Sequence, residues 1–232
     1  MKKMEKLPEI PLITGNAPFE YAEAYKTLRT NFNFLAANSA KRKLLVTSSV
    51  PDEGKTSVTI NLALSLAQIG KKVLLVDADM RNPSLHRYLR VKWDKEKGLT
   101  AILTGSAELQ DCIMETVHGF DLIPGGIIPP NPAELVSSKA MNDMLEKTLE
   151  SYDFVICDTP PVGVVTDAAA ASTLCDGVLF VVRQKATKKP VVQEALRRLE
   201  TVHAKVLGVV MNYYDMRDMS KREYGYYSNY MK

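Results

Sequence analysis

The stretch SSVPDEGKTS, residues 48–57, has the residue types and spacing of a phosphate-binding loop. From Ser49 to Thr56 it follows the pattern G-x-x-x-x-G-K-[ST], with serine in place of the first glycine. Backbone N–H groups of such a loop and the N-terminus of the next helix bind anions, Lys55 brings a positive charge to the phosphates, and Thr56 offers a hydroxyl to Mg²⁺. The pattern predicts nucleotide contacts from Ser49, Asp52, Glu53, Gly54, Lys55, Thr56 and Ser57.

Three carboxylates lie at the ends of two further apolar segments. Asp77 and Asp79 follow LLV at 74–76, and Asp158 ends VIC at 155–157. A single aspartate at a strand end is usually a helix cap or a turn former, and a chance turn could account for Gly54 and Thr56. Three such carboxylates beside a phosphate loop are better explained as Mg²⁺ ligands and a base or water-positioning group.

These residues need a scaffold that brings strand ends together, and the hydrophobic pattern supplies one. Near-continuous apolar runs alternate with helical patterns, which predicts an α/β fold with a mostly parallel sheet covered by helices on both faces. Ligands then bind at the carboxyl ends of the strands. The strands are expected at 43–49, 71–79, 120–126, 152–161, 177–183 and 204–212, and the helices at about 17–40, 56–70, 132–151 and 189–204. Residues 80–119 are expected to form a loop-and-helix excursion.

Composition bounds the remaining possibilities. With 232 residues, 46% of them hydrophobic, the chain suits a single domain over residues 1–232. A net charge of +3 is too balanced to indicate nucleic-acid binding. Three separated cysteines favour neither a disulfide framework nor a zinc site and fit a reducing cytoplasm. We expect no membrane span and no secretion signal, so membrane association would require a partner.

The three boxes SSVPDEGKTS, LLVDADMR and VICDTPP resemble the Walker A, Walker A′ and Walker B boxes of the bacterial tyrosine kinases, the cytoplasmic kinases of capsule and exopolysaccharide biosynthesis. The resemblance extends from about residue 19 to the C-terminus. It implies a P-loop NTPase fold, unrelated to eukaryotic protein kinases, with ATP and Mg²⁺ as cofactors. It further implies that the protein is a tyrosine autokinase that regulates polysaccharide synthesis and export.

The same resemblance assigns roles to individual residues. Lys55 becomes the phosphate-binding lysine, and the metal site is formed by Thr56, Asp77 and Asp158. Asp77 and Asp79 become the catalytic acidic pair, with Asp158 as the Walker B carboxylate. A phenol with a pKa of about 10 is a poor nucleophile, so a nearby carboxylate is chemically useful. We expect Asp77 in that role, although the assignment to Asp77 and Asp79 could be reversed.

Two positions depart from the usual loop pattern. Ser49 replaces the first glycine, and Asp52 stands where glycine is common. Aspartate tolerates a positive φ better than most residues, but its charge beside a triphosphate is mildly unfavourable. These two residues therefore bear on how tightly ATP is expected to bind, more than on whether it binds.

The predicted N-terminal helix carries Glu23, Lys26 and Arg29 on one face. From spacing alone, a solvated stripe with intrahelical ion pairs is favoured over an interface. The resemblance reverses this preference, because the family uses an ExxRxxR motif at this place to assemble homo-oligomeric rings, such as octamers. Lysine in place of the middle arginine weakens bidentate recognition of a carboxylate.

A flexible, tyrosine-rich tail is expected at about 213–232. Its end, YGYYSNYMK, contains four tyrosines, Tyr224, Tyr226, Tyr227 and Tyr230. The resemblance implies that these are phosphoacceptors, used in trans by a neighbouring subunit. It also implies a transmembrane activating adaptor of the polysaccharide co-polymerase type, which would hold the kinase at the inner face of the cell membrane. A tyrosine phosphatase and other protein substrates complete the expected partners, and no nucleic acid is predicted.

Two strand-end residues are weaker candidates. Asn212 ends VLGVVMN, where related domains use an asparagine on adenine, but a polar strand end is equally expected. Arg183 ends LFVVR and could reach a nucleotide or an incoming tyrosine, or simply cap a surface strand.

Two other functions compete with the kinase. A ParA/MinD-like partitioning or positioning ATPase would share the fold, but its signature lysine falls where this chain has Val50, and the C-terminus has no amphipathic helix for a membrane. A non-catalytic nucleotide-sensing module would use the same residues as a kinase.

Overall fold

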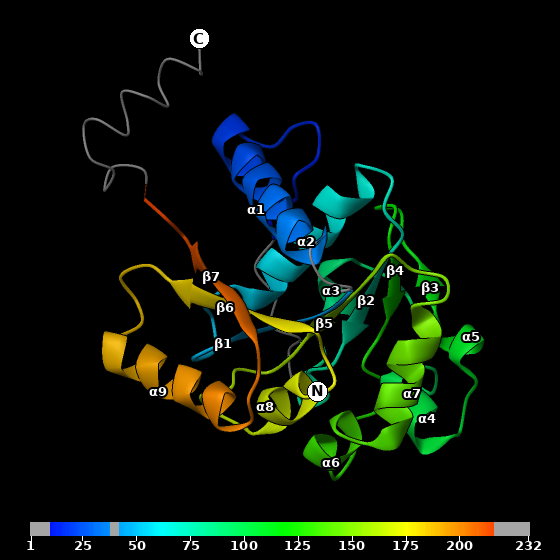
Figure 1. Cartoon of the computed structure of the whole chain (residues 1–232). Coiled ribbons are helices and arrows are strands. Elements are labelled where there is room, and N and C mark those ends of the chain that lie inside the picture. Colours follow the sequence, from blue (N-terminus) through cyan, green and yellow to red (C-terminus); the bar gives the residue numbers. More distant parts are fainter. Residues whose placement is uncertain (1–9, 38–41, 216–232) are drawn as a thin grey trace, which may run out of the picture.

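The structure, a computed structural model, describes residues 10–37 and 42–215. In this part of the chain seven strands form a single sheet in the order β3-β4-β2-β5-β1-β6-β7 (Figure 1). The strands are β1 (Lys43–Ser48), β2 (Val73–Asp77), β3 (Met114–Glu115), β4 (Asp121–Ile123), β5 (Phe154–Asp158), β6 (Gly177–Arg183) and β7 (Val206–Asn212).

The sheet is parallel except at one edge, where β3 pairs antiparallel with β4. The α/β prediction with a mostly parallel sheet is therefore confirmed. β6 has the predicted bounds, whereas β2, β4 and β5 are shorter than the apolar runs that predicted them. The two-residue strand β3 lies in the predicted excursion and was not expected, because two residues are too few to show a period.

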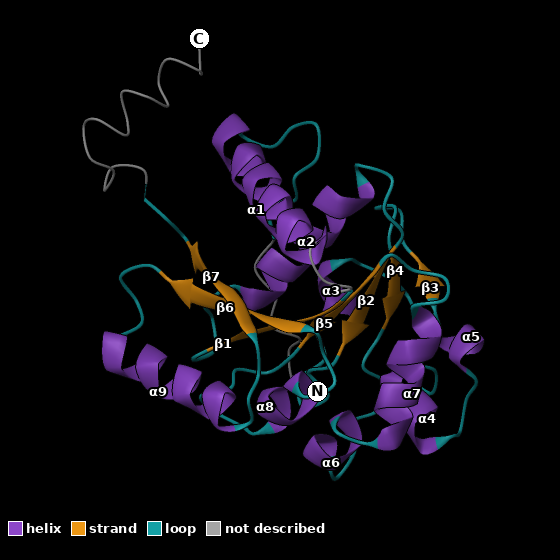
Figure 2. Ribbon diagram, in the orientation of Figure 1, coloured by secondary structure: helices purple, strands orange, loops and turns teal. Residues whose placement is uncertain are grey.

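Helices cover both faces of the sheet, as Figure 2 shows. One face carries α1 (Phe19–Ala37), α2 (Lys55–Ala67) and α3 (Leu85–Tyr88). The other carries α4 (Leu99–Thr104), α5 (Leu109–Cys112), α6 (Pro132–Val136), α7 (Lys139–Thr148), α8 (Asp167–Ser172) and α9 (Lys189–Thr201).

Two apolar clusters fill the space between the sheet and these helices. Successive strand residues alternate between them, since side chains of a strand point to opposite faces. In β1, Leu44 and Val46 belong to the cluster under α2, while Leu45 belongs to the cluster under α7 and α8. All three are at most 1% exposed. Burial on both faces fixes the strand register and thereby the place where each strand ends.

The helix predicted at 132–151 is divided into α6 and α7. Ser137 ends α6, and Ser138 begins α7 by accepting a hydrogen bond from the N–H of Met141. Serine competes with helix continuation by bonding to nearby backbone groups, and two serines in sequence make the break. The apolar spacing continues across the break, which is why the pattern alone predicted one helix.

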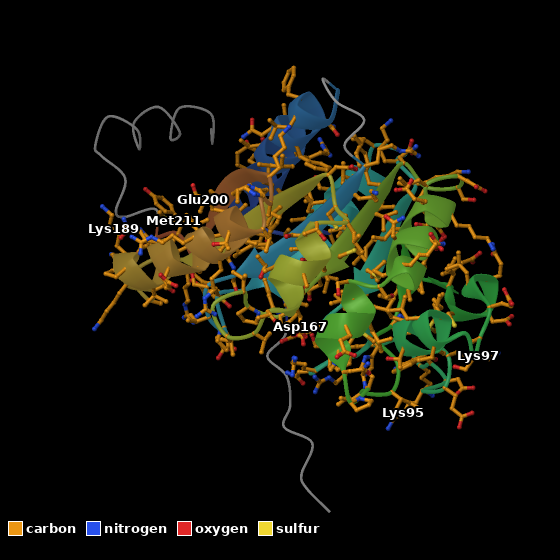
Figure 3. The ribbon with its side chains drawn as sticks, turned by 60° about the horizontal axis from the view of Figure 1, so that its bottom comes forward. Lys95, Lys97, Asp167, Lys189, Glu200 and Met211 are labelled. Carbon is orange, nitrogen blue, oxygen red and sulfur yellow. The ribbon has the colours of Figure 1, made fainter. Side chains whose placement is uncertain are left out.

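Side chains of the described residues are drawn in Figure 3, where charged groups such as Lys95, Lys97 and Lys189 lie at the periphery. Within residues 10–37 and 42–215, no helix has the length and apolar character needed to span a bilayer. Beyond Asp215, the tail tyrosines lie outside the described residues.

Candidate active site

A cavity of about 620 Å³ opens where β1, β2 and β5 end, which is where a parallel sheet is expected to bind ligands. Its floor is formed by the loop between β1 and α2, with Gly54, Lys55, Thr56 and Ser57 along it. Asp79, just after β2, lines the same cavity. The structure thus brings together the phosphate loop and part of the acidic pair that the sequence predicted.

The loop has the backbone shape of an anion cradle. Asp52 and Gly54 have φ of 64° and 83°, in the left-handed region. The positive φ of Gly54 favours glycine, and a Cβ there would lie 2.0 Å from the side-chain nitrogen of Asn212, so a larger residue would also displace Asn212. Aspartate tolerates this conformation at 52, as its type suggested.

Glu53 supports the loop from behind. Its side chain is buried, and its carboxylate accepts hydrogen bonds from the N–H groups of Ser49 and Val50, the N–H of Arg183 and the hydroxyl of Thr187. The carboxylate is therefore occupied by protein donors, and Glu53 can offer a nucleotide only its backbone. The sequence predicted Glu53 only as a nucleotide contact of the phosphate loop and did not predict this structural role.

Ser49 also lies beneath the loop and does not line the cavity. It is fully buried, and its hydroxyl oxygen has no hydrogen-bond partner among the described residues. A Cβ on Gly163 would lie 2.1 Å from the carbonyl oxygen of Ser49. The loop is thus packed directly against the segment that follows β5.

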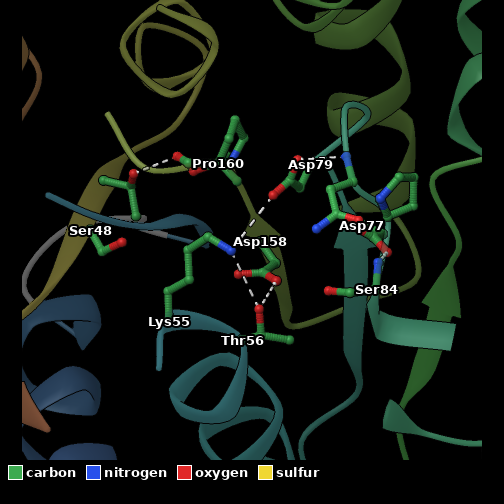
Figure 4. A network of polar contacts seen from close by, with 12 residues as sticks. Ser48, Lys55, Thr56, Asp77, Asp79, Ser84, Asp158 and Pro160 are labelled. Carbon is green, nitrogen blue, oxygen red and sulfur yellow. Dashed lines mark hydrogen bonds and ion pairs between the residues drawn. The ribbon is translucent and has the colours of Figure 1, made fainter. Parts of the chain in front are cut away.

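Lys55, Thr56 and Asp158 form the centre of the site (Figure 4). The Thr56 hydroxyl donates to Asp158 Oδ2 at 2.7 Å, and the Lys55 ammonium lies 3.7 Å from Asp79 Oδ2. Burial lowers the pKa of Lys55, but Asp158, Asp79 and Asp77 together outweigh it and raise the pKa above its usual value. Lys55 therefore remains a cation that faces the cavity.

Asp77 and Asp79 differ in their surroundings, although they are two residues apart. Asp77 is fully buried beneath the cavity, where Oδ2 accepts from the N–H groups of Ser84 and Leu85, each at 2.9 Å. Burial, with Asp158 opposite it in the sheet, raises the pKa of Asp77 to about 8. Asp79 is 7% exposed and faces the cavity beside Lys55.

The side-chain oxygens at the centre of the site suit a magnesium ion that is also bound by phosphate oxygens. Asp77 Oδ1 is buried without a hydrogen-bond partner among the described residues, and the Thr56 hydroxyl and Asp158 are in contact close by. Oxygen ligands of this kind suit Mg²⁺. Within the part that the structure describes, no three His, Cys, Asp or Glu side chains form a metal site by themselves. Magnesium would therefore need phosphate oxygens and water as further ligands.

The other end of the loop is covered by the C-terminal end of β7. The Asn212 side chain donates to the carbonyl oxygen of Glu53 at 3.0 Å and does not line the cavity. Tyr213 does line it, with the Arg183 guanidinium 4.3 Å from its ring centroid. The predicted contact of Asn212 with adenine thus competes with its bond to the loop, and Tyr213 is a wall residue that sequence reasoning missed.

Sequence reasoning also missed the wall beyond Asp79. Arg87 and Tyr88 of α3 line the cavity, as does Arg81, which is paired with the buried Asp167. Arg81 ends the LLVDADMR box, two residues after Asp79, and this was the one available signal. Arg87, Tyr88 and Asp167 lie in the excursion and at the start of α8, where no motif marks them.

The residues predicted for assembly lie on α1. Lys26 and Glu23 form an exposed ion pair at 2.6 Å, as in the solvated-stripe interpretation. Arg29 instead donates to the carbonyl oxygen of Ser65 on α2 at 2.8 Å. Arg29 therefore joins α1 to the helix that follows the phosphate loop, and the ring interface stays a prediction.

Comparisons with known proteins agree with this geometry. The sequence pattern of the AAA domain family matches residues 52–209. Tyrosine-protein kinase YwqD of Bacillus subtilis is 38% identical over 208 residues, which cover 89% of this chain and 86% of YwqD. The kinase domain of Escherichia coli tyrosine kinase ETK superposes with a TM-score of 0.81 at 36% identity, covering 85% of this chain and 77% of that domain.

The fold is also that of more distant P-loop NTPases. The septum site-determining protein MinD of Pyrococcus horikoshii, solved with Mg-ADP, has a TM-score of 0.64 at 24% identity, over 79% of this chain and 75% of MinD. At this identity the likeness concerns the fold alone. Since the matches above 30% identity described here are tyrosine kinases and cover most of both chains, this chain belongs to the bacterial tyrosine-protein kinase family.

Proposed function

We propose that the protein transfers the γ-phosphoryl group of ATP to tyrosines, including Tyr224, Tyr226, Tyr227 and Tyr230 of a neighbouring copy. The convergence of Lys55, Asp79 and Asp158 on one phosphate loop carries this proposal. Membership of a tyrosine kinase family supports tyrosine as the acceptor.

The reaction needs little covalent chemistry from the protein. The phenol oxygen forms a bond to the γ-phosphorus, the bond from that phosphorus to the oxygen bridging to the β-phosphate breaks, and ADP leaves. The loop N–H groups and Lys55 hold the phosphates as negative charge shifts towards ADP. Thr56, Asp158 and Asp77 would hold magnesium together with phosphate oxygens, and a bound ion would supply positive charge to the phosphates.

The phenolic proton is best received by Asp79. Asp79 lines the cavity, whereas both the burial of Asp77 and its two backbone hydrogen bonds keep Asp77 under the floor. A general base must come within hydrogen-bond reach of the proton that it accepts. We therefore reverse the assignment expected from sequence, with Asp79 as the base and Asp77 as a metal-binding group.

The family further suggests the biological setting. We propose that a transmembrane adaptor of the polysaccharide co-polymerase type recruits the kinase to the inner face of the membrane and activates it, and that the pair regulates polysaccharide synthesis and export. A tyrosine phosphatase would reset the tail. Each phosphotyrosine adds about −1.5 to −2 charges at pH 7, so phosphorylated tails crowded in a ring should repel and separate the subunits.

The deciding experiment incubates the full chain with Mg-ATP, with and without the cytoplasmic segment of a co-expressed adaptor, and locates phosphotyrosine by mass spectrometry. We expect tail phosphorylation that is stronger with the adaptor and absent in Lys55→Ala. ATP hydrolysis without phosphotyrosine in either condition would instead support the positioning ATPase.

Native mass measurement of the same samples tests the ring. We expect an oligomer before the reaction and smaller species after full phosphorylation. An unchanged assembly would refute the charge-repulsion mechanism while leaving the kinase activity intact.

A further inference from the structure

We infer that the part of the cavity beyond Asp79 is a slot for the acceptor tyrosine, with an apolar wall for the ring and a cationic rim for an acidic neighbour of that tyrosine. The inference rests on the proposed kinase function and adds the residues that select the substrate. Pro161 and Arg81 end the VICDTPP and LLVDADMR boxes, whereas Val164, Val165 and Arg87 lie outside all three boxes.

The slot has two walls of different chemistry. One comes from the segment between β5 and α8 and presents Pro161, Val164 and Val165. The other comes from the segment after β2 and presents Arg81 and Arg87. Lys55 and Asp79 line the same cavity as both walls, so a group that enters the slot shares the cavity with the phosphate loop and the acidic pair.

Val164 is an apolar side chain that is 57% exposed at the cavity, on a segment that is held firmly. The N–H of Val162 donates to the carbonyl oxygen of Ser48, and Arg198 donates to that of Gly163, each at 2.9 Å. The close approach of Gly163 to Ser49 leaves no room for a side chain there. Val164 is thus held in place from behind while its own surface stays open.

The second wall is anchored too, in part to the residue that begins α8, just after the segment that carries Val164. Arg81 forms two hydrogen bonds with the Asp167 carboxylate, at 2.8 and 2.9 Å, and Asp167 is 1% exposed. The Arg81 side chain nevertheless remains 44% exposed. Arg87 is tied to Asn82 and to the carbonyl oxygen of Pro83. Paired guanidinium groups are oriented by such contacts, so the rim carries cations in defined positions.

A tyrosine suits both features, while serine and threonine do not. The phenol carries its hydroxyl at the far end of a flat apolar ring, so the ring can lie on Val164 while the hydroxyl reaches Asp79. The hydroxyl of serine or threonine lies next to the main chain and cannot do both. Burial of the ring against Val164 gives the selectivity, because apolar area removed from water is stabilising.

The cationic rim adds a preference among tyrosines. In the tail sequence KREYGYYSNYMK, Glu223 directly precedes Tyr224, while Tyr226, Tyr227 and Tyr230 have no acidic residue on either side. The three basic residues of this sequence, Lys221, Arg222 and Lys232, lie further from Tyr224 than Glu223 does. Attraction between Glu223 and the rim therefore predicts that Tyr224 is phosphorylated first.

The test uses the full chain as enzyme and a peptide of residues 216–232 as acceptor, and it measures kcat/KM for the peptide and the Kd for ADP in parallel. Val164→Asp should lower kcat/KM by roughly 10-fold or more, since even one methylene in a specificity pocket is worth about 10- to 200-fold. The Kd for ADP should not change. Val117→Asp is the matched control, because Val117 is 95% exposed and does not line the cavity.

A double-mutant cycle between the peptide and the enzyme tests the cationic rim. Replacing Glu223 of the peptide by Gln should slow phosphorylation of Tyr224 by roughly 2- to 5-fold, the usual size of an exposed ion pair. With Arg87→Gln enzyme the same peptide change should have no effect. Equal losses of rate with both enzymes would show that Glu223 acts elsewhere, and the proposed role of the cationic rim would be wrong.

The outcomes separate the two proposals. If the unaltered chain phosphorylates no tyrosine with the adaptor present, the proposed function is wrong, and the acceptor slot that rests on it is wrong as well. If it phosphorylates the peptide and Val164→Asp matches Val117→Asp, the slot alone is wrong. Should Val164→Asp not fold, Val164→Ala replaces it, with a smaller loss of kcat/KM expected at constant Kd for ADP, and no loss would count against the slot.

Discussion

The two ends of the cavity are built in opposite ways. At the phosphate end, loop backbone and buried carboxylates hold one another, and Glu53 is 1% exposed while it accepts bonds from three backbone N–H groups. At the other end, Val164 and Arg81 are open to solvent, while Val162 and Asp167, which help to hold them, are buried.

The difference reflects what each end has to bind. A triphosphate always presents the same oxygens, so a rigid cradle assembled before binding loses little entropy when the ligand arrives. An acceptor segment differs from one tyrosine to the next, and open side chains on anchored supports can meet several of them. Substitutions at the phosphate end should therefore affect both nucleotide binding and phosphoryl transfer. Those at the open end should affect only the binding of the acceptor tyrosine.

The largest effect is expected for Lys55→Ala. Lys55 is the cation that faces the cavity between Asp79 and Asp158, and loss of one such group typically costs about a hundred- to a thousandfold in rate. Phosphotyrosine formation should fall by at least this factor. A variant that keeps most of its activity would show that the phosphates are held by the loop backbone alone.

Glu53→Gln tests whether the phosphate end is assembled in advance. An amide keeps the shape, but its NH₂ group meets N–H donors of the loop, and an unsatisfied buried donor costs about 1 to 3 kcal/mol. We expect ADP affinity to fall by roughly tenfold, with a lower free energy of unfolding. Isothermal titration measures the first and urea denaturation the second.

The matched control for this substitution is Glu96→Gln at an exposed position. It should change neither ADP affinity nor stability. Unchanged ADP affinity in Glu53→Gln would mean that the loop keeps its shape without the carboxylate.

Asp77→Asn should separate stability from function. Because the pKa of Asp77 is raised from 3.8 to about 8, the metal-free folded protein keeps a proton between these values that the unfolded chain has lost. Its stability therefore falls as pH rises across that window, and asparagine removes this slope. Because asparagine stays neutral where Asp77 begins to ionise, Asn should raise the stability at pH 8 while it weakens nucleotide binding that depends on magnesium.

Urea denaturation at pH 6 and pH 8 in EDTA measures this effect. Equal pH slopes in the variant and the unaltered chain would contradict it. Added Mg-ADP should stabilise the unaltered chain more than the variant, because binding to the folded state raises stability.

The smallest effect is expected behind the open end. Arg198→Ala removes hydrogen bonds to the carbonyl oxygens of Val162 and Gly163 and should cost about 0.5 to 1.5 kcal/mol of stability. Peptide phosphorylation should weaken with constant ADP affinity. The neighbour Arg197 pairs only with Glu194 at the surface in the described part, so Arg197→Ala is the control that should leave both unchanged. Loss of ADP affinity in Arg198→Ala would show that the two ends are not independent.

Much of the fold was readable from local patterns. The strand 177–183 and the order of the elements followed from apolar runs, because a strand buried on both faces needs apolar residues at every position. The division into α6 and α7 and the short strand β3 were not readable. The first depends on a serine cap within a continuous apolar spacing, and the second on pairing with β4.

The sequence by itself determined the chemistry at the phosphate end. The spacing of Gly54, Lys55 and Thr56 in one turn, and the aspartates that end apolar strands, are local features, and parallel strands bring their carboxyl ends to one edge. These features are close in the chain or fixed by the strand period, so a pattern suffices to predict them.

Only the tertiary structure decided where each side chain faces. It placed Asp79 in the cavity and Asp77 below it, turned Glu53 towards Arg183 and Thr187, brought Arg81 to Asp167, and placed Val164 on the wall of the cavity. Glu53 and Arg183 are 130 positions apart, and Arg81 and Asp167 are 86 apart. Contacts over such separations exist only once the sheet is assembled, and they decide which residues meet the substrate and which hold the site together.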